Sequence, residues 1–162
     1  MRDFIGTKMI KAKPMTRLDY NTLRGWALPD DEDGSDQGYL VEYTDGGSPN
    51  CEGYKGYVSW SPEEQFENAY KTSGELSFGH AVKLLKLGMR VSRAGWNGKG
   101  MFLFLVPGST FKVNRPPLLG IYREGKEINY CPHIDMRTAD NKIVPWLASQ
   151  TDILAEDWQA FI

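Results

Sequence analysis

Apolar and polar residues interleave in several short stretches of the chain, and a period of two residues is typical of β-strands with one solvated face. Residues 8–13 mix apolar with basic side chains, whereas residues 39–43 form a more continuous apolar run bounded by turn-forming residues. Strands are predicted over residues 8–13, 39–43, 56–60, 90–93, 101–106, 118–122 and 128–136, with Pro132 interrupting the last of these, and residues 158–161 are predicted as a final strand or turn.

Helix-start signals precede only short stretches with helical periodicity. Thr16 is predicted to cap a first helix, Ser61 a second, with Pro62 in its first position, and Ser77 a third, which Gly88 ends. A fourth, short helix is predicted over residues 151–155. The predicted class is therefore α+β, with antiparallel strands, a few short helices and an N-terminal α/β extension.

The dipeptide Asn97-Gly98 lies between two predicted strands and indicates a β-hairpin, because both central residues of a type I′ turn need positive φ. Trp96 lies beside glycines at this predicted turn, where burial in a core is least expected. Two interpretations stay open: a plain hairpin turn, or a tip that presents Trp96, Asn97 and Lys99 to a ligand. An indole suits a base, an amide suits its edge and an ammonium group suits a phosphate.

The 162 residues, of which 41% are hydrophobic, fit a globular chain with one domain or with a small domain and an appendage. No apolar stretch is long enough for a membrane span, and the N-terminus lacks the apolar core of a signal peptide. Two cysteines, Cys51 and Cys131, are too few to organise the fold by disulfides. A reducing, cytoplasmic setting is therefore predicted.

The net charge of −2 hides a segregation along the chain. Residues 76–123 carry 8 basic and no acidic residues, whereas residues 1–75 carry 8 basic and 14 acidic residues and residues 124–162 carry 3 and 7. The basic block either pairs with its acidic flanks or attracts an anionic ligand, for which Arg93 and Lys99 are candidate contacts. The acidic total argues against a duplex nucleic-acid binder.

No metal or nucleophilic site stands out, and no cofactor is expected. Cys131 and His133 are two residues apart, so in a strand their side-chain origins lie about 7 Å apart, too far for a direct hydrogen bond. Too few His and Cys residues exist for a metal site, and the acidic turn at residues 30–36 lacks the spacing of a calcium loop. Asp135 remains a candidate for a structural role or for ligand contact.

A polar run precedes the last predicted helix. It offers small hydroxyls, an amide and a carboxylate in Ser149, Gln150, Thr151 and Asp152. One interpretation is a helix cap at Ser149 or Thr151 with Asp152 in the first turn, and the other is hydrogen bonding to a ribose or a base. Both roles can coexist.

Six motifs follow one another after residue 74: Leu76-Ser-Phe-Gly79, Val91 to Met101, Phe102 to Pro107, Pro132 to Met136, Val144 to Asp152 and Asp157-Trp158. In this order they resemble the Thoeris anti-defense 2 family of phage proteins. Residues 8–72 resemble a segment that is often fused ahead of this domain. We therefore expect an N-terminal extension of unknown role over residues 1–73 and a nucleotide-binding domain over residues 74–162.

The resemblance implies a sponge and not an enzyme. Members of the family sequester cyclic ADP-ribose-type signals made by bacterial TIR-domain enzymes, and some also bind cyclic dinucleotides at a separate site. The family assembles as homotetramers that enclose ligand between subunits. By motif, Trp96 would stack on the ligand base with Asn97 beside it. Phe102, a further candidate contact, stands where many relatives have Trp. Further implied contacts are Asp135, Ser149, Gln150, Thr151 and Asp152.

Two other functions remain open from the residues alone. The aromatic-rich N-terminal third fits a structural or protein-interaction module of a phage particle or a host-takeover complex. His133 and Asp135 would serve as the acid and base groups of an enzyme that hydrolyses a nucleotide.

Overall fold

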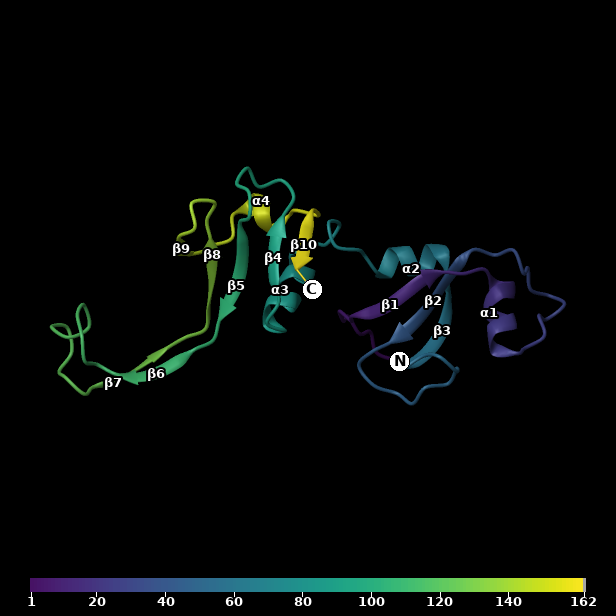
Figure 1. Cartoon of the computed structure of the whole chain (residues 1–162), viewed down its shortest axis with the longest axis horizontal. Helices are drawn as coiled ribbons and strands as arrows, with labels where there is room; N and C mark the ends of the chain where they lie inside the picture. Colours follow the sequence, from purple (N-terminus) through teal and green to yellow (C-terminus); the bar gives the residue numbers. More distant parts are fainter. Residues whose placement is uncertain (162) are drawn as a thin grey trace. The chain divides into compact units, whose positions relative to one another are not determined.

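The computed structural model describes residues 1–161, which fold as two compact units, Met1–Lys71 and Thr72–Ile162 (Figure 1). Both units are built on antiparallel sheets with short helices, which confirms the predicted α+β class. Within residues 1–161, no helix combines the length and the apolar character needed to cross a membrane.

The N-terminal unit is a three-stranded antiparallel sheet with one helix on each face. Its elements are β1 (Ile10–Pro14), α1 (Arg17–Arg24), β2 (Gly38–Tyr43), β3 (Tyr57–Pro62) and α2 (Glu63–Ala69), in the strand order β1-β2-β3. Tyr20 of α1 packs with Leu40 and Val58 on one face of the sheet. Phe66 of α2 stacks on Tyr39, which points to the other face, with ring centroids 4.0 Å apart.

The predicted caps of this unit are right for α1 and wrong for α2. Thr16 accepts a hydrogen bond from the Asp19 backbone N–H at 3.1 Å, as predicted. Ser61 does not cap α2, because β3 continues past it and pairs Ser61 with Tyr39 of β2. The helix consequently begins at Glu63 without a side-chain cap.

The C-terminal unit is a five-stranded antiparallel sheet in the order β10-β4-β5-β8-β9, with a separate two-stranded pair. Its elements are α3 (Phe78–Lys86), β4 (Arg90–Arg93), β5 (Phe102–Val106), β6 (Ser109–Lys112), β7 (Glu127–Tyr130), β8 (His133–Arg137), β9 (Ile143–Pro145), α4 (Gln150–Ile153) and β10 (Trp158–Phe161). Strands β6 and β7 pair with each other and connect β5 to β8 (Figure 1). Strands β6 and β9 were not anticipated from the sequence pattern.

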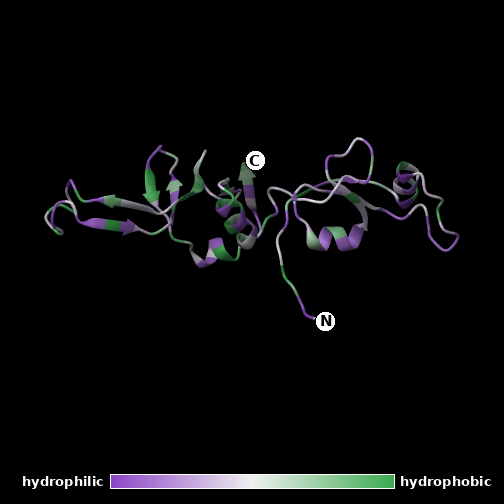
Figure 2. Cartoon of the chain, turned by 90° about the horizontal axis from the view of Figure 1, so that it is seen from below, coloured by the Kyte–Doolittle hydropathy of each residue, from purple (hydrophilic) through white to green (hydrophobic). Residues whose placement is uncertain are grey.

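The core of this unit lies between α3 and one face of the sheet. Its fully buried side chains include Ala81 and Leu85 of α3, together with Val91, Leu103 and Trp158 of three adjacent strands. Figure 2 shows hydrophobic residues concentrated along the strands near the C-terminus. Ser77 is the N-cap of α3 and Gly88 follows its end with a φ of 82°, as predicted. His80 completes a capping box with Ser77, which was not predicted.

Two local predictions in this unit are wrong. Residues 118–122 form turns with one isolated bridge instead of a strand, because the chain reverses at Gly120, whose φ is 117°. Strands β4 and β5 do pair antiparallel, but residues 94–101 connect them, so Asn97-Gly98 is not a two-residue type I′ turn. In residues 1–161, the non-glycine residue with positive φ is Asn141, in the turn between β8 and β9.

Candidate functional site

A network around Arg93 joins the β4–β5 loop to the end of the chain. The Arg93 side chain, at the end of β4, donates to Asp157 at 2.8 Å and to Asp152 at 2.9 Å. Asp157 also accepts a hydrogen bond from the Gly95 backbone N–H at 2.8 Å. These contacts link residues 59 to 64 positions apart, so the loop is fixed by partners remote in sequence.

Asp152 is the most heavily bonded carboxylate of the network. It lies in the first turn of α4, where Ser149 is the N-cap and the two residues form a capping box. The Ser149 hydroxyl donates to Asp152 at 2.6 Å, and the Trp96 indole N–H donates to its other oxygen at 3.3 Å. Of the two predicted cap positions, Ser149 is therefore the cap, and Asp152 lies in the first turn as predicted. The Asp152 carboxylate also anchors the loop.

The electrostatics of the network favour its charged form. The hydrogen bond to Arg93 holds the pKa of Asp157 below its ordinary value. Burial acts to raise the pKa of Asp152, but hydrogen bonds from Ser149, Arg93 and Trp96 outweigh it and the pKa is lowered. The same two carboxylates, Asp157 first, raise the pKa of Arg93. One guanidinium is therefore neutralised by two carboxylates, and little of its charge remains for an anionic ligand.

Trp96 lies against the core, contrary to the expectation of an exposed turn residue. Its side chain is partly buried and packs on the core cluster. Its ring meets Trp158 edge to face, with centroids 5.7 Å apart and planes at 76°. The indole N–H of Trp96 donates a hydrogen bond to Asp152, and this bond satisfies the polar end of the partly buried ring. The bond and the ring packing together hold the loop of residues 94–101 against the sheet.

Exposed polar side chains surround this anchored loop. Asn97 and Lys99 come from the loop, and Gln150 and Thr151 come from the first turn of α4. The Thr151 hydroxyl bonds only Ser149, and within residues 1–161 the side-chain polar atoms of Asn97, Lys99 and Gln150 make no hydrogen bond to the protein. These groups can therefore bind a ligand without breaking a contact of the folded chain.

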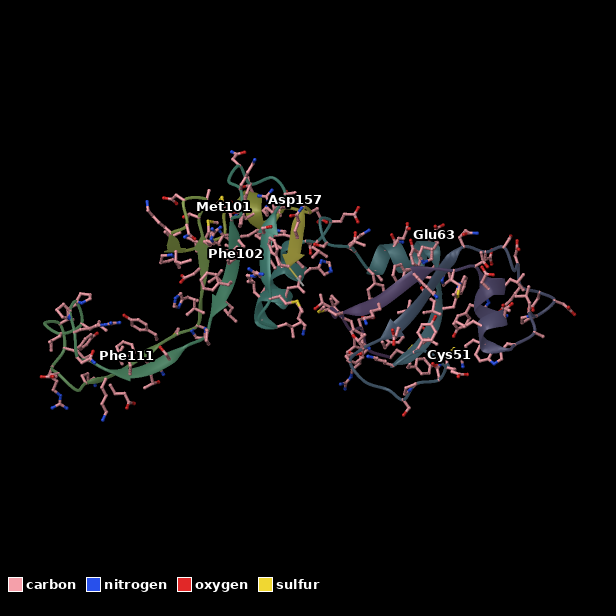
Figure 3. The ribbon with its side chains drawn as sticks, viewed as in Figure 1. Cys51, Glu63, Met101, Phe102, Phe111 and Asp157 are labelled. Carbon is pink, nitrogen blue, oxygen red and sulfur yellow. The ribbon has the colours of Figure 1, made fainter. Side chains whose placement is uncertain are left out.

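Two of the predicted contact residues lie elsewhere. Phe102 and Asp135 belong to β5 and β8, where they alternate with Leu103 and Met136, which pack in or against the core. Their side chains consequently point to the sheet face opposite α3. Figure 3 labels Phe102 on β5 and Asp157 near β10. The structure thus brings Arg93 and Trp96 to Asp152 at the start of α4, with Asn97 and Lys99 on the same loop, and places Phe102 and Asp135 on the opposite sheet face.

Asp157 is the residue of this region that sequence reasoning missed as a contact. Its partners, Arg93 and Gly95, lie more than 60 residues earlier, and nothing in the local pattern near residue 157 indicates them. The available signal was the pairing of β10 with β4, which sets Trp158 opposite Arg93 and brings the preceding carboxylate beside the guanidinium.

Cys131, His133 and Asp135, the reactive groups that the sequence singles out, lie in β8 or just before it. The His133 ring lies 3.1 Å from the backbone carbonyl of Cys131, so the thiol and the imidazole do not form a nucleophile–base pair. The nearest carboxylate oxygen of Asp135 is 3.7 Å from His133. Among residues 1–161, no three His, Cys, Asp or Glu side chains are grouped to hold a metal ion.

Comparison with known proteins places the similarity in the C-terminal unit. The model of the Thoeris anti-defense 2-like domain matches residues 76–161. The protein named Thoeris anti-defense 2 from Bacillus phage SP01 is 48% identical over 84 residues, which are 52% of this chain and 92% of that protein. The matched residues include the β4–β5 loop, α4 and Asp157, whereas the N-terminal unit lies outside the match.

Proposed function

The chain belongs to the Thoeris anti-defense 2-like family, and we propose that it is a phage anti-defence protein that sequesters cyclic ADP-ribose-type immune signals without cleaving them. The name of the Bacillus phage relative, which the match covers over 92% of its length, supports the anti-defence role. The ligand class and the absence of turnover are the further content of the proposal.

The observation that carries the proposal is an anchored loop whose exposed polar side chains make no hydrogen bond to the protein within residues 1–161. The hydrogen bonds among Arg93, Asp152, Asp157 and the Gly95 backbone hold residues 94–101 in place. Asn97 and Lys99 on that loop remain exposed. A cyclic ADP-ribose isomer carries a base, riboses and a diphosphate, which an amide, hydroxyls and an ammonium group complement. Preorganisation lowers the entropy cost of binding, as a sponge requires.

The part of the Trp96 side chain that is not buried also supports the proposal. The ring meets Trp158 edge to face and its N–H is bonded to Asp152, so the ring is held in one orientation. A fixed aromatic ring offers a stacking surface at little cost in side-chain entropy. The family resemblance adds a homotetramer that encloses ligand between subunits in the host bacterial cytoplasm, and a separate cyclic dinucleotide site. These belong to the same proposal.

Chromatography of a cyclic ADP-ribose isomer before and after incubation with the full chain tests the proposal. A sponge removes free ligand and returns it intact when the protein is heated. An enzyme returns a product instead, and a protein-interaction module leaves the isomer untouched. Either of these two results would contradict the proposal.

Matched variants locate the site. Asn97→Ala and Lys99→Ala remove exposed side chains that make no protein contact within residues 1–161, so we expect weaker capture with an unchanged melting temperature. Lys142→Ala is the control for Lys99→Ala, because Lys142 is exposed and pairs with Asp140 at the turn between β8 and β9. Equal capture by all three variants would remove the β4–β5 loop from the site.

A further inference from the structure

The C-terminal end of the β4–β5 loop has an anchor of its own, which comes from the turn between β8 and β9. The Arg137 side chain, at the end of β8, donates to the Gly100 backbone carbonyl at 2.6 Å and to the Asn141 side-chain carbonyl at 2.9 Å. A β carbon added at Gly100 would lie 3.1 Å from this guanidinium group, and one added at Gly98 would lie 3.0 Å from the Ala139 methyl group. Glycine therefore permits the loop to lie against the turn.

Arg137 keeps its positive charge, unlike Arg93 at the other end of the loop. Arg93 is bonded to two carboxylates, whereas both partners of Arg137 are neutral groups. Within residues 1–161, no carboxylate forms an ion pair with Arg137. A guanidinium group has five N–H donors and these contacts use two of them, so three have no partner in the part of the chain that the structure describes. The half-buried side chain is thus held in one orientation with donors to spare.

A second cation without a counter-charge lies next to this anchor along the chain. Lys99 immediately precedes Gly100, its side chain is exposed, and within residues 1–161 it makes neither an ion pair nor a hydrogen bond. Figure 3 labels Met101, which ends the loop one residue beyond Gly100. A guanidinium fork recognises two phosphate oxygens at a fixed angle, and an ammonium group on a flexible stem adds a point charge. An anion bound by both groups also relieves the repulsion between them.

The two ends of the loop therefore differ in their chemistry. Trp96 supplies an aromatic ring, and the cation beside it, Arg93, is neutralised by Asp152 and Asp157. The other end carries two cations that have no carboxylate partner within residues 1–161. A nucleotide has the same polarity, because its base is aromatic and its phosphate is an anion. The order of these groups along the loop thus matches their order in such a ligand.

We propose that Arg137, oriented by Asn141, binds the phosphate oxygens of the ligand together with Lys99. The inference deepens the proposed function, on which it rests for the identity of the ligand as a nucleotide with a diphosphate. It assigns the diphosphate to the Gly100 end of the loop and the base to the Trp96 end. The guanidinium fork contacts two phosphate oxygens, and the ammonium group contributes its charge.

Substitutions that remove or keep the charge of Arg137 test this assignment in the full chain. Titration calorimetry at several salt concentrations measures the binding of inorganic pyrophosphate and of a cyclic ADP-ribose isomer. Arg137→Gln removes the charge, so both probes should bind at least about tenfold more weakly and with a smaller salt dependence. Arg137→Lys keeps the charge but loses the fork, so it should keep the wild-type salt dependence with an intermediate affinity. Arg123→Gln makes the same change at an exposed arginine between β6 and β7 and should bind as the wild type does.

A substitution at Asn141 tests the positioning role separately. Asn141 has a φ of 65°, which glycine adopts without strain, so Asn141→Gly keeps the turn and loses only the side-chain amide. Arg137 then keeps its charge but loses the bond that orients it. Both probes should therefore bind about two- to tenfold more weakly, with the salt dependence and the melting temperature of the wild type. A wild-type affinity in this variant would contradict positioning by Asn141.

The outcomes separate this proposal from the proposed function. Wild-type affinity and salt dependence in Arg137→Gln, or a loss of equal size in Arg123→Gln, would overturn the phosphate site even if the isomer is captured intact. A chain that binds pyrophosphate through Arg137 but does not bind the isomer would overturn the proposed ligand and leave the phosphate site standing. Binding of neither probe would overturn both. Circular dichroism at the titration temperature shows which variants are folded, and Arg137→Lys gives the comparison if Arg137→Gln is not.

Discussion

The two units of the chain use the same architecture but hold it together differently. In the N-terminal unit, the bidentate pair of Arg17 with Glu32 joins residues 15 positions apart and fixes a turn. In the C-terminal unit, Arg93 joins residues 59 and 64 positions away and fixes a loop. Closing a longer stretch of chain costs more entropy, so the Arg93 contacts constrain the chain more than the Arg17 pair does. The difference shows that the charged side chains of the C-terminal unit hold a loop against the end of the chain, whereas the Arg17 pair is comparatively local.

The largest expected effect is on stability, and it tests whether the cores of the two units unfold independently. Trp158→Ala should destabilise the C-terminal unit by about 3–5 kcal/mol, because Trp158 is fully buried and also donates to the Asp152 carbonyl. Differential scanning calorimetry should show one transition shifted down and the N-terminal one unchanged. Trp26→Ala, at a tryptophan that is 53% exposed in the N-terminal unit, is the control and should change little. A common shift of both transitions would show that the units unfold together.

A second effect distinguishes anchoring from stacking at Trp96. Trp96→Ala removes both the stacking face and the N–H bonded to Asp152, whereas Trp96→Phe keeps an aromatic face and loses only that bond. Base stacking contributes roughly 1–3 kcal/mol, so the alanine variant should lose about 5- to 150-fold in affinity measured by calorimetry. The phenylalanine variant should retain most of it. Equal affinities in both variants would assign Trp96 to packing alone.

The third prediction concerns the anchor that sequence reasoning missed. Asp157→Asn removes the charge that faces Arg93, and hydrogen bonds to charged groups contribute about 1.5–3 kcal/mol. The free energy of unfolding of the C-terminal unit should fall by about that amount. Ligand capture should also weaken, because Gly95 and the loop lose a hydrogen-bond partner of full charge. Asp140→Asn removes an exposed carboxylate of the same unit and should have a much smaller effect. Equal effects would mean that the network does not hold the loop.

The pH dependence of stability provides a fourth test. The pKa values of Asp152 and Asp157 are lower in the folded chain than the ordinary Asp value of about 3.9, so protons bind the unfolded chain more tightly. Their stabilisation is complete above that value and is lost as the pH falls through the folded pKa values. The melting temperature of the C-terminal unit should therefore fall less between pH 6 and pH 3 in Asp157→Asn than in the wild type. An identical fall would contradict the charged network.

The smallest expected effect is on the salt dependence of ligand binding. The sequence favours Arg93 and Lys99 of the basic block as contacts of an anionic ligand. In the structure, Arg93 is paired twice, Arg90 lies over the Phe102 ring on the opposite sheet face, and Arg137 donates to the Gly100 carbonyl of the loop. The Lys99 ammonium group makes no ion pair or hydrogen bond within residues 1–161. Screening acts over about 8 Å at physiological ionic strength, so Lys99→Ala should flatten the salt slope more than Arg90→Ala. Equal slopes in both variants would indicate a diffuse field from the basic block.

Much of the fold was predictable from short-range patterns. Thr16, Ser77 and Ser149 each cap a helix as predicted, because the hydrogen bonds of a cap involve residues within about three positions. The alternation of side chains and the short apolar runs likewise identify strands such as β2 and β5. The motifs after residue 74 were sufficient for the family, which the comparisons show.

The tertiary structure alone decided the environment of the candidate site. The sequence places Trp96 and Phe102 in one short segment, but pairing with distant strands turns Trp96 toward Trp158 and Phe102 to the opposite face. Asp157 becomes an anchor only because β10 pairs with β4. Local preferences act over a few residues, whereas the packing of a side chain is set by strands up to 64 positions away. The sequence therefore determined which groups are available, and the sheet determined which of them anchor the loop, which stay exposed on it and which lie on the opposite face.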